Sequence, residues 1–67
     1  MIKIVLNGES REVPDGLALA GLLEWLNLAV DRVAVERNLK IIPRGEWQST
    51  PIEPGDCLEV VHFVGGG

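Results

Sequence analysis

Two side chains of this 67-residue sequence titrate near neutral pH by default, Cys57 and His62. A thiol beside an imidazole forms the nucleophilic pair of cysteine enzymes, provided that the two groups come within hydrogen-bond reach. Both residues belong to one apolar run, "CLEVVHFV", and lie five positions apart. Because an odd spacing puts two strand residues on opposite faces, we expect a packed thiol and a strand-end histidine instead of a catalytic pair.

Paired carboxylates are a second arrangement that could do chemistry. Glu9 and Glu12 lie close in sequence, and Glu53 and Asp56 flank a Pro-Gly turn. Acidic side chains are mostly solvated unless they are paired, so we expect all four in solvent, with Asp56 also bonding backbone N–H groups of its turn. One cysteine excludes an intramolecular disulfide and a multi-cysteine metal site. The sequence therefore predicts no enzyme active site and no metal site.

The last three residues, Gly65, Gly66 and Gly67, offer a different chemistry. Three specified glycines arise by chance roughly three times in 10,000, and without Cβ atoms they make an arm that enters a narrow channel. The carboxylate of Gly67, with an ordinary pKa of about 3.3 to 3.7, is an ionised nucleophile at neutral pH but a poor acylating agent. Attack on the α-phosphate of ATP would activate it as an acyl-adenylate. The sequence has no phosphate-binding loop, so we expect a partner enzyme to bind the ATP and this domain to bind no cofactor.

The overall composition limits the other classes of function. Ten acidic residues against six basic ones give a net charge of −4, which lacks the positive footprint of a nucleic-acid-binding protein. No apolar stretch is long enough to span a membrane, and the N-terminus has no signal-peptide pattern. We expect a cytoplasmic protein, monomeric when free, with one domain at residues 1–64 and a flexible tail at residues 65–67.

Hydrophobic periodicity predicts the elements that carry this terminus. Residues 2–6 and 9–13 alternate around Asn7-Gly8, the signature of a type I′ β-hairpin. Residues 18–27 carry leucines at helical spacing, although the helix start is poorly marked. Residues 31–38 alternate again as a third strand, and residues 39–56 are mostly irregular with a short strand at 40–42. The anchors of this irregular segment to the core are predicted to be Leu39, Ile42, Trp47 and Ile52.

The run 57–64 is the longest and most apolar strand, which predicts a central place in the sheet. Because Glu59 must reach water, we assign Leu58 and Val60 to the helix-covered face. Val61 and Phe63 then lie on the open face as a candidate partner-docking patch. The alternative is that Trp47 or the irregular segment folds over them.

One helix cannot bury its apolar stripe alone, so it must lie across one face of a sheet. The link through the helix is long enough to join parallel second and third strands. These conditions predict an α+β protein of the β-grasp, or ubiquitin-like, architecture, with a mixed four- or five-stranded sheet packed on one main helix.

Several motifs resemble one family. "VAVERN", "IIPRGEW" and "GDCLEVVHFVGGG" are similar to the sulfur carrier proteins of thiamine biosynthesis, the ThiS family. The resemblance implies a protein co-substrate and not an enzyme. An adenylyltransferase related to ubiquitin-activating enzymes would consume ATP to adenylate Gly67, and sulfur from a cysteine desulfurase would convert it to a thiocarboxylate for thiazole synthase. Gly65 and Gly66 would thread the partners' active sites.

Three alternatives stay open on the sequence. The small subunit of molybdopterin synthase shares this fold and tail, and a ubiquitin-like modifier would be joined to target lysines. An interaction domain with an incidental tail belongs to a different class.

Overall fold

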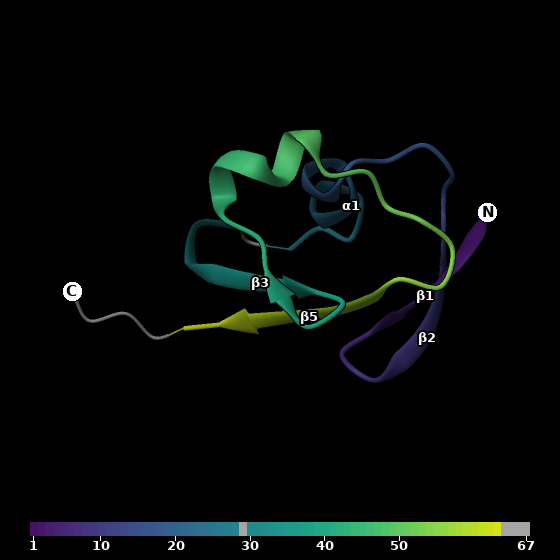
Figure 1. Cartoon of the computed structure of the whole chain (residues 1–67), viewed down its shortest axis with the longest axis horizontal. Helices are drawn as coiled ribbons and strands as arrows, with labels where there is room; N and C mark the ends of the chain where they lie inside the picture. Colours follow the sequence, from purple (N-terminus) through teal and green to yellow (C-terminus); the bar gives the residue numbers. More distant parts are fainter. Residues whose placement is uncertain (29, 64–67) are drawn as a thin grey trace.

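A five-stranded mixed sheet carries one α-helix on one of its faces (Figure 1). The structure is a computed structural model that describes residues 1–28 and 30–63. The strands are β1 (Ile2–Leu6), β2 (Glu9–Val13), β3 (Val33–Arg37), β4 (Lys40–Ile41) and β5 (Cys57–His62). The helices are α1 (Leu19–Trp25) and two 3₁₀ segments, η1 (Val30–Arg32) and η2 (Arg44–Ser49). This is the β-grasp architecture that the sequence predicts.

The sheet order is β2-β1-β5-β3-β4, so β5 is the central strand, as its apolar sequence predicts. It runs parallel to β1 and antiparallel to β3. Because β1 and β2 are antiparallel, β2 and β3 point the same way, with β1 and β5 between them. The predicted parallel relation of β2 and β3 is therefore confirmed, although the two strands are not neighbours.

The predicted turn between β1 and β2 is also confirmed. Asn7 has φ 50° and Gly8 has φ 82°, the two positive values that a type I′ turn requires. Asparagine and glycine tolerate this left-handed region better than other residues, so this dipeptide sets the register of the hairpin.

Helix α1 is shorter than the predicted 18–27 because its ends are set by other segments. Ala18 gives no side-chain cap, and the N–H of Leu19 donates instead to the carbonyl of Thr50 at 2.8 Å. At the other end Asn27 takes φ 59°, which stops the helix. Of the predicted leucine stripe, Leu19, Leu22 and Leu23 are fully buried, and Leu26 is partly buried against the core.

Leu39 is the one predicted core anchor that is wrong. It is 93% exposed, in the β3–β4 turn with φ 72°. The predicted anchors Trp47 and Ile52 are buried, and Ile42 is partly buried against the core. The indole N–H of Trp47 donates to the Ile42 carbonyl at 2.9 Å, which satisfies its buried polar atom.

Within residues 1–28 and 30–63, none of the helices combines the length and the apolar character needed to cross a bilayer.

Candidate functional site

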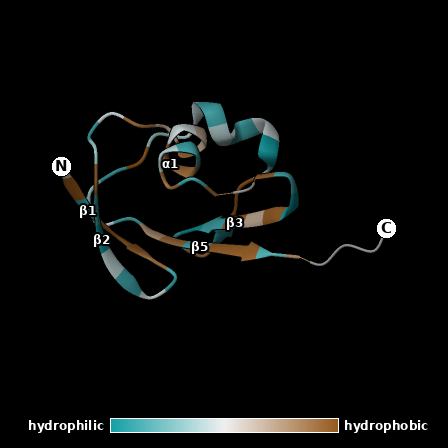
Figure 2. Ribbon diagram, turned by 180° about the vertical axis from the view of Figure 1, so that it is seen from behind, coloured by the Kyte–Doolittle hydropathy of each residue, from teal (hydrophilic) through white to brown (hydrophobic). Residues whose placement is uncertain are grey.

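The C-terminal half of β5 and the residue that follows it expose apolar side chains on the sheet face that α1 leaves open. Val61 is 56% exposed and Phe63 is 50% exposed, so neither Trp47 nor the irregular segment covers them. Val61 stands opposite Ala34 of β3, which is also exposed. Figure 2 shows the hydrophobic colour running along β5. The exposure that a docking patch requires is therefore present, while its role in docking stays a prediction.

This open face also carries carboxylates. Glu59 of β5 stands directly opposite Glu36 of β3, and Glu36 stands opposite Ile41 of β4. Directly opposite residues of antiparallel strands point to the same face, so the acids border the apolar residues. Ile41 is 71% exposed. The face therefore combines apolar area with negative charge.

The predicted carrier residues Gly65, Gly66 and Gly67 lie outside the described residues, as does Val64. Their predicted roles stay predictions. The last described residue is Phe63, whose N–H donates to the carbonyl of Arg32 at 3.0 Å. The end of the described chain is thus bonded to the residue that immediately precedes β3.

Cys57 and His62 do not form a catalytic pair. Cys57 stands opposite Val5, at the start of β5, and His62 stands opposite the buried Val33, at its end. Because their offset along the strand is odd, the two side chains point to opposite faces, as predicted. Both are exposed.

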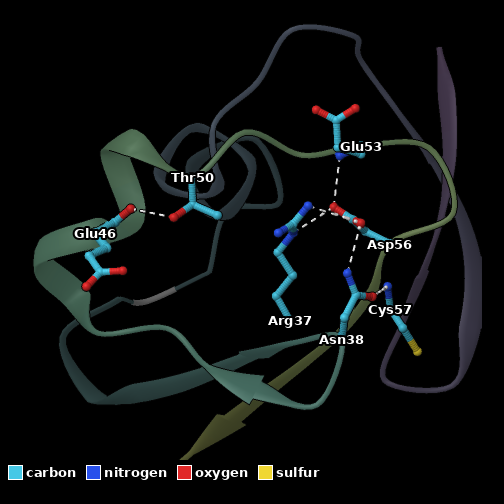
Figure 3. A network of polar contacts seen from close by, with 7 residues as sticks. All are labelled: Arg37, Asn38, Glu46, Thr50, Glu53, Asp56 and Cys57. Atoms are coloured by element: carbon cyan, nitrogen blue, oxygen red, sulfur yellow. Dashed lines mark hydrogen bonds and ion pairs between the residues drawn. The ribbon is translucent and has the colours of Figure 1, made fainter.

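Asp56 corrects the expectation that the four acids are solvated, because it is only 5% exposed. Arg37 donates to both carboxylate oxygens, from Nε at 2.9 Å and from Nη2 at 3.3 Å (Figure 3). The Asn38 amide donates to Oδ1 at 3.2 Å, and the backbone N–H of Glu53 donates to Oδ2 at 2.8 Å. The predicted bond from Asp56 to its own turn is therefore present, within a larger network.

These contacts decide the charge state of Asp56. Burial raises the pKa of the carboxyl group, but the N–H of Glu53, the Arg37 guanidinium and the Asn38 amide outweigh it and hold the pKa below its usual value. The carboxylate is therefore ionised and fully bonded at neutral pH. It ties the β3–β4 turn to the start of β5, which is a structural role and not a catalytic one.

Sequence reasoning missed Arg37 and Asn38 because they lie 19 and 18 positions before Asp56. Asn38 has a further bond, since its Oδ1 accepts from the N–H of Cys57 at 2.9 Å. An Asn at a turn predicts local bonding only, and the pattern holds no signal for a partner across the sheet.

Sequence reasoning also missed the side chain of Asn7. The N–H of Val60 donates to Asn7 Oδ1 at 2.8 Å, and Asn7 Nδ2 donates to the Val60 carbonyl at 3.2 Å. A turn residue thus also holds the middle of β5.

In the described part of the chain, His, Cys, Asp and Glu side chains form no group of three or more that could hold a metal ion.

An open cavity of about 480 Å³ lies between the 15–18 and 48–54 segments and reaches Ile2. Ile2 begins β1, and β5 runs parallel to β1, so this cavity is at the opposite end of the sheet from Phe63.

The sequence and the fold are both similar to those of known proteins. The profile of the ThiS family matches residues 4–67. The chain belongs to the ThiS family. The crystal structure of a thiamine biosynthesis protein (ThiS) from Geobacter metallireducens superposes with a TM-score of 0.87 at 30% identity, covering 98% of this chain and 100% of that one. The sulfur carrier protein ThiS of Bacillus subtilis is 36% identical over 63 residues, which is 92% of this chain and 96% of that protein.

Two longer proteins contain a region similar to this ThiS-family chain. The thiazole synthases of Magnetococcus marinus and Paramagnetospirillum magneticum are 46% and 41% identical to it over 66 residues. The match takes 98% of this chain and 20% of each of those proteins. The chain therefore spans about a fifth of the length of these two relatives.

Proposed function

We propose that this ThiS-family chain is a sulfur carrier for thiamine biosynthesis, whose C-terminal glycine, Gly67, donates sulfur to the thiazole ring as a thiocarboxylate. The observation that carries the proposal is that nearly the whole chain is similar to a part of two proteins named thiazole synthase. A carrier region within a synthase indicates that the two act on one reaction. The similarity of the full chain to a protein named sulfur carrier protein ThiS supports the same role.

The proposed chemistry needs two steps at Gly67. A carboxylate oxygen attacks the α-phosphorus of ATP on a partner adenylyltransferase, and the bond to pyrophosphate breaks. A sulfur nucleophile then attacks the carbonyl carbon, and AMP leaves with the electrons of the acyl C–O bond. Where a desulfurase persulfide delivers the sulfur, a thiol must reduce the resulting acyl disulfide, and the thiocarboxylate is released.

Each part of the molecule has a task in this scheme. Gly65 and Gly66 give a backbone without Cβ atoms that enters the partners' active sites. Val61 and Phe63 give the partners an exposed apolar patch on a rigid strand. The domain is a co-substrate here and not the catalyst, because the ATP and the thiazole precursor are bound by the partner enzymes.

Intact-mass spectrometry tests the proposal. The chain is incubated with a ThiS-system adenylyltransferase, ATP and sulfide. We expect a shift equal to replacing one oxygen by one sulfur, located at Gly67 by fragmentation. A chain lacking Gly67 is the matched control, and it should show no shift.

Adding candidate target proteins, a molybdopterin precursor or thiazole synthase with its substrates to this mixture separates the rival functions. Covalent conjugates to other proteins would indicate a modifier. Sulfur passed to a molybdopterin precursor and not to thiazole would indicate a molybdopterin synthase subunit. An unchanged mass, where a known ThiS carrier is converted, would leave a plain interaction domain and refute the proposal.

A further inference from the structure

The side-chain amide of Asn7 takes the place of a peptide group in the β1–β5 ladder. Before it, the ladder is ordinary backbone pairing: the Val5 N–H donates to the Asp56 carbonyl at 2.9 Å, and the Asn7 N–H donates to the Leu58 carbonyl at 2.8 Å. At Asn7 the backbone turns away into the hairpin with φ 50°. The amide then supplies both an acceptor and a donor to Val60, at 2.8 and 3.2 Å.

The two bonds from the Asn7 amide extend the pairing of β5 on its β1 side toward the C-terminal end of the strand. The strand register on the β1 side runs to Leu58, and the Asn7 amide carries it two residues further, to Val60. On the β3 side, pairing continues through His62, and Phe63 is bonded to Arg32. Val60 is therefore the last residue of β5 that described contacts fix on both of its edges.

We propose that Asn7 is a positioning residue for the carrier terminus: its amide clamps β5 at Val60 and so fixes the direction in which Gly67 is presented to the partner enzyme. This inference rests on the proposed function. Residues 61–63 are held on their β3 side, so loss of the amide would let this end of β5 shift and would change where the chain to Gly67 begins. A carboxylate in line with the α-phosphorus reacts far faster than a misplaced one.

The turn and the clamp are separable roles of the same residue. Asn7→Gly keeps the left-handed turn, because glycine adopts φ > 0 without strain, but it removes both side-chain bonds to Val60. Asn7→Asp keeps an acceptor for the Val60 N–H and loses the donor. Both variants keep the side chains of Val61 and Phe63, so the KM reports recognition and the kcat reports positioning.

The experiment has two readouts. Amide hydrogen exchange is measured at Val60, and steady-state thiocarboxylate formation is measured with a ThiS-system adenylyltransferase, ATP and sulfide. For Asn7→Gly we expect faster Val60 exchange and a kcat lowered roughly tenfold, with the KM for the carrier within about twofold of wild type. Asn7→Asp should give a Val60 exchange rate and a kcat between those of wild type and Asn7→Gly.

Val13→Ala is the control for general loss of stability. Val13 is fully buried and stands opposite Ile2, at the other end of the hairpin. It should destabilise the fold and leave kcat unchanged. A wild-type kcat in Asn7→Gly, or an equal fall in Val13→Ala, would overturn the positioning role. A wild-type chain that is never converted would refute the proposed function instead, and unchanged Val60 exchange would refute the clamp by itself.

Discussion

Arg37 Nε lies 2.9 Å from Asp56 Oδ2, and this ion pair joins the end of β3 to the residue that precedes β5. Both partners are shielded from water, with side chains 25% and 6% exposed. The pair therefore differs from a surface salt bridge, which contributes little to stability. It fixes the central strand of the sheet at the point where that strand begins.

Asp56→Asn should lower the free energy of unfolding by about 1.5 to 3 kcal/mol, the usual size for hydrogen bonds to a charged group. The substitution removes the charge that Arg37 neutralises and leaves the partly buried guanidinium without its anion. Urea denaturation followed by tryptophan fluorescence measures the change. Glu12→Gln, at an exposed position, should change the stability by less than about 0.5 kcal/mol. Equal stability of the two variants would contradict the role given to Asp56.

Acid should weaken the fold through the same carboxylate. The pKa of Asp56 is lower in the folded chain than in the unfolded chain, so ionisation of this carboxyl group stabilises the folded state. Its stabilisation is fully present above the unfolded pKa of about 3.9 and is lost as the pH falls through the lower folded pKa. We expect the unfolding free energy of wild type to fall with pH in this acid window, and that of Asp56→Asn to fall less. Parallel curves for the two proteins would show that Asp56 is not the group responsible.

Phe63→Ala should weaken partner binding more than folding. Because Phe63 is half-exposed, its truncation should cost well below the roughly 3 to 5 kcal/mol of a core phenylalanine. Calorimetry with the adenylyltransferase gives the affinity, and thermal unfolding gives the stability. The matched control is Val60→Ala, in β5 three residues earlier and at 7% exposure, which should destabilise folding and spare binding. The reverse pattern would place the docking surface elsewhere.

Leu39→Asn should stabilise the chain by about 1 kcal/mol. Leucine at φ 72° carries the steric cost of the left-handed region, and at 93% exposure it returns little packing energy. Asparagine tolerates the same backbone at lower cost. Ile41→Asn, a similarly exposed apolar residue in a strand, should give no gain. A loss of stability at Leu39 would mean that its side chain packs in the folded state.

The sequence predicts the elements well because each follows from local periodicity. Alternation predicts the strands, the leucine spacing predicts α1, and Asn7-Gly8 predicts the turn. The central place of β5 follows from its apolar run. Each of these inferences needs only residues close in sequence.

The failures all involve partners distant in sequence or a competing backbone demand. Asp56 is buried because Arg37 and Asn38 come to it across the sheet, which no local pattern shows. Leu39 counts as a core residue by its type, but the tight β3–β4 turn leaves it no path inward. Of the candidate site, the exposure of Val61 and Phe63 was predictable, since one helix covers one face only. The amide of Asn7 was not, because the turn already accounted for that residue.

The middle strand of the sheet is the last strand of the sequence. A nascent chain that has left the ribosome up to residue 56 therefore lacks the strand that joins its two strand pairs, β1–β2 and β3–β4, into one sheet. Only the arrival of β5 closes the sheet over the leucines of α1. Folding must wait for the C-terminal segment, so the open face that carries Val61 forms only on chains synthesised through β5.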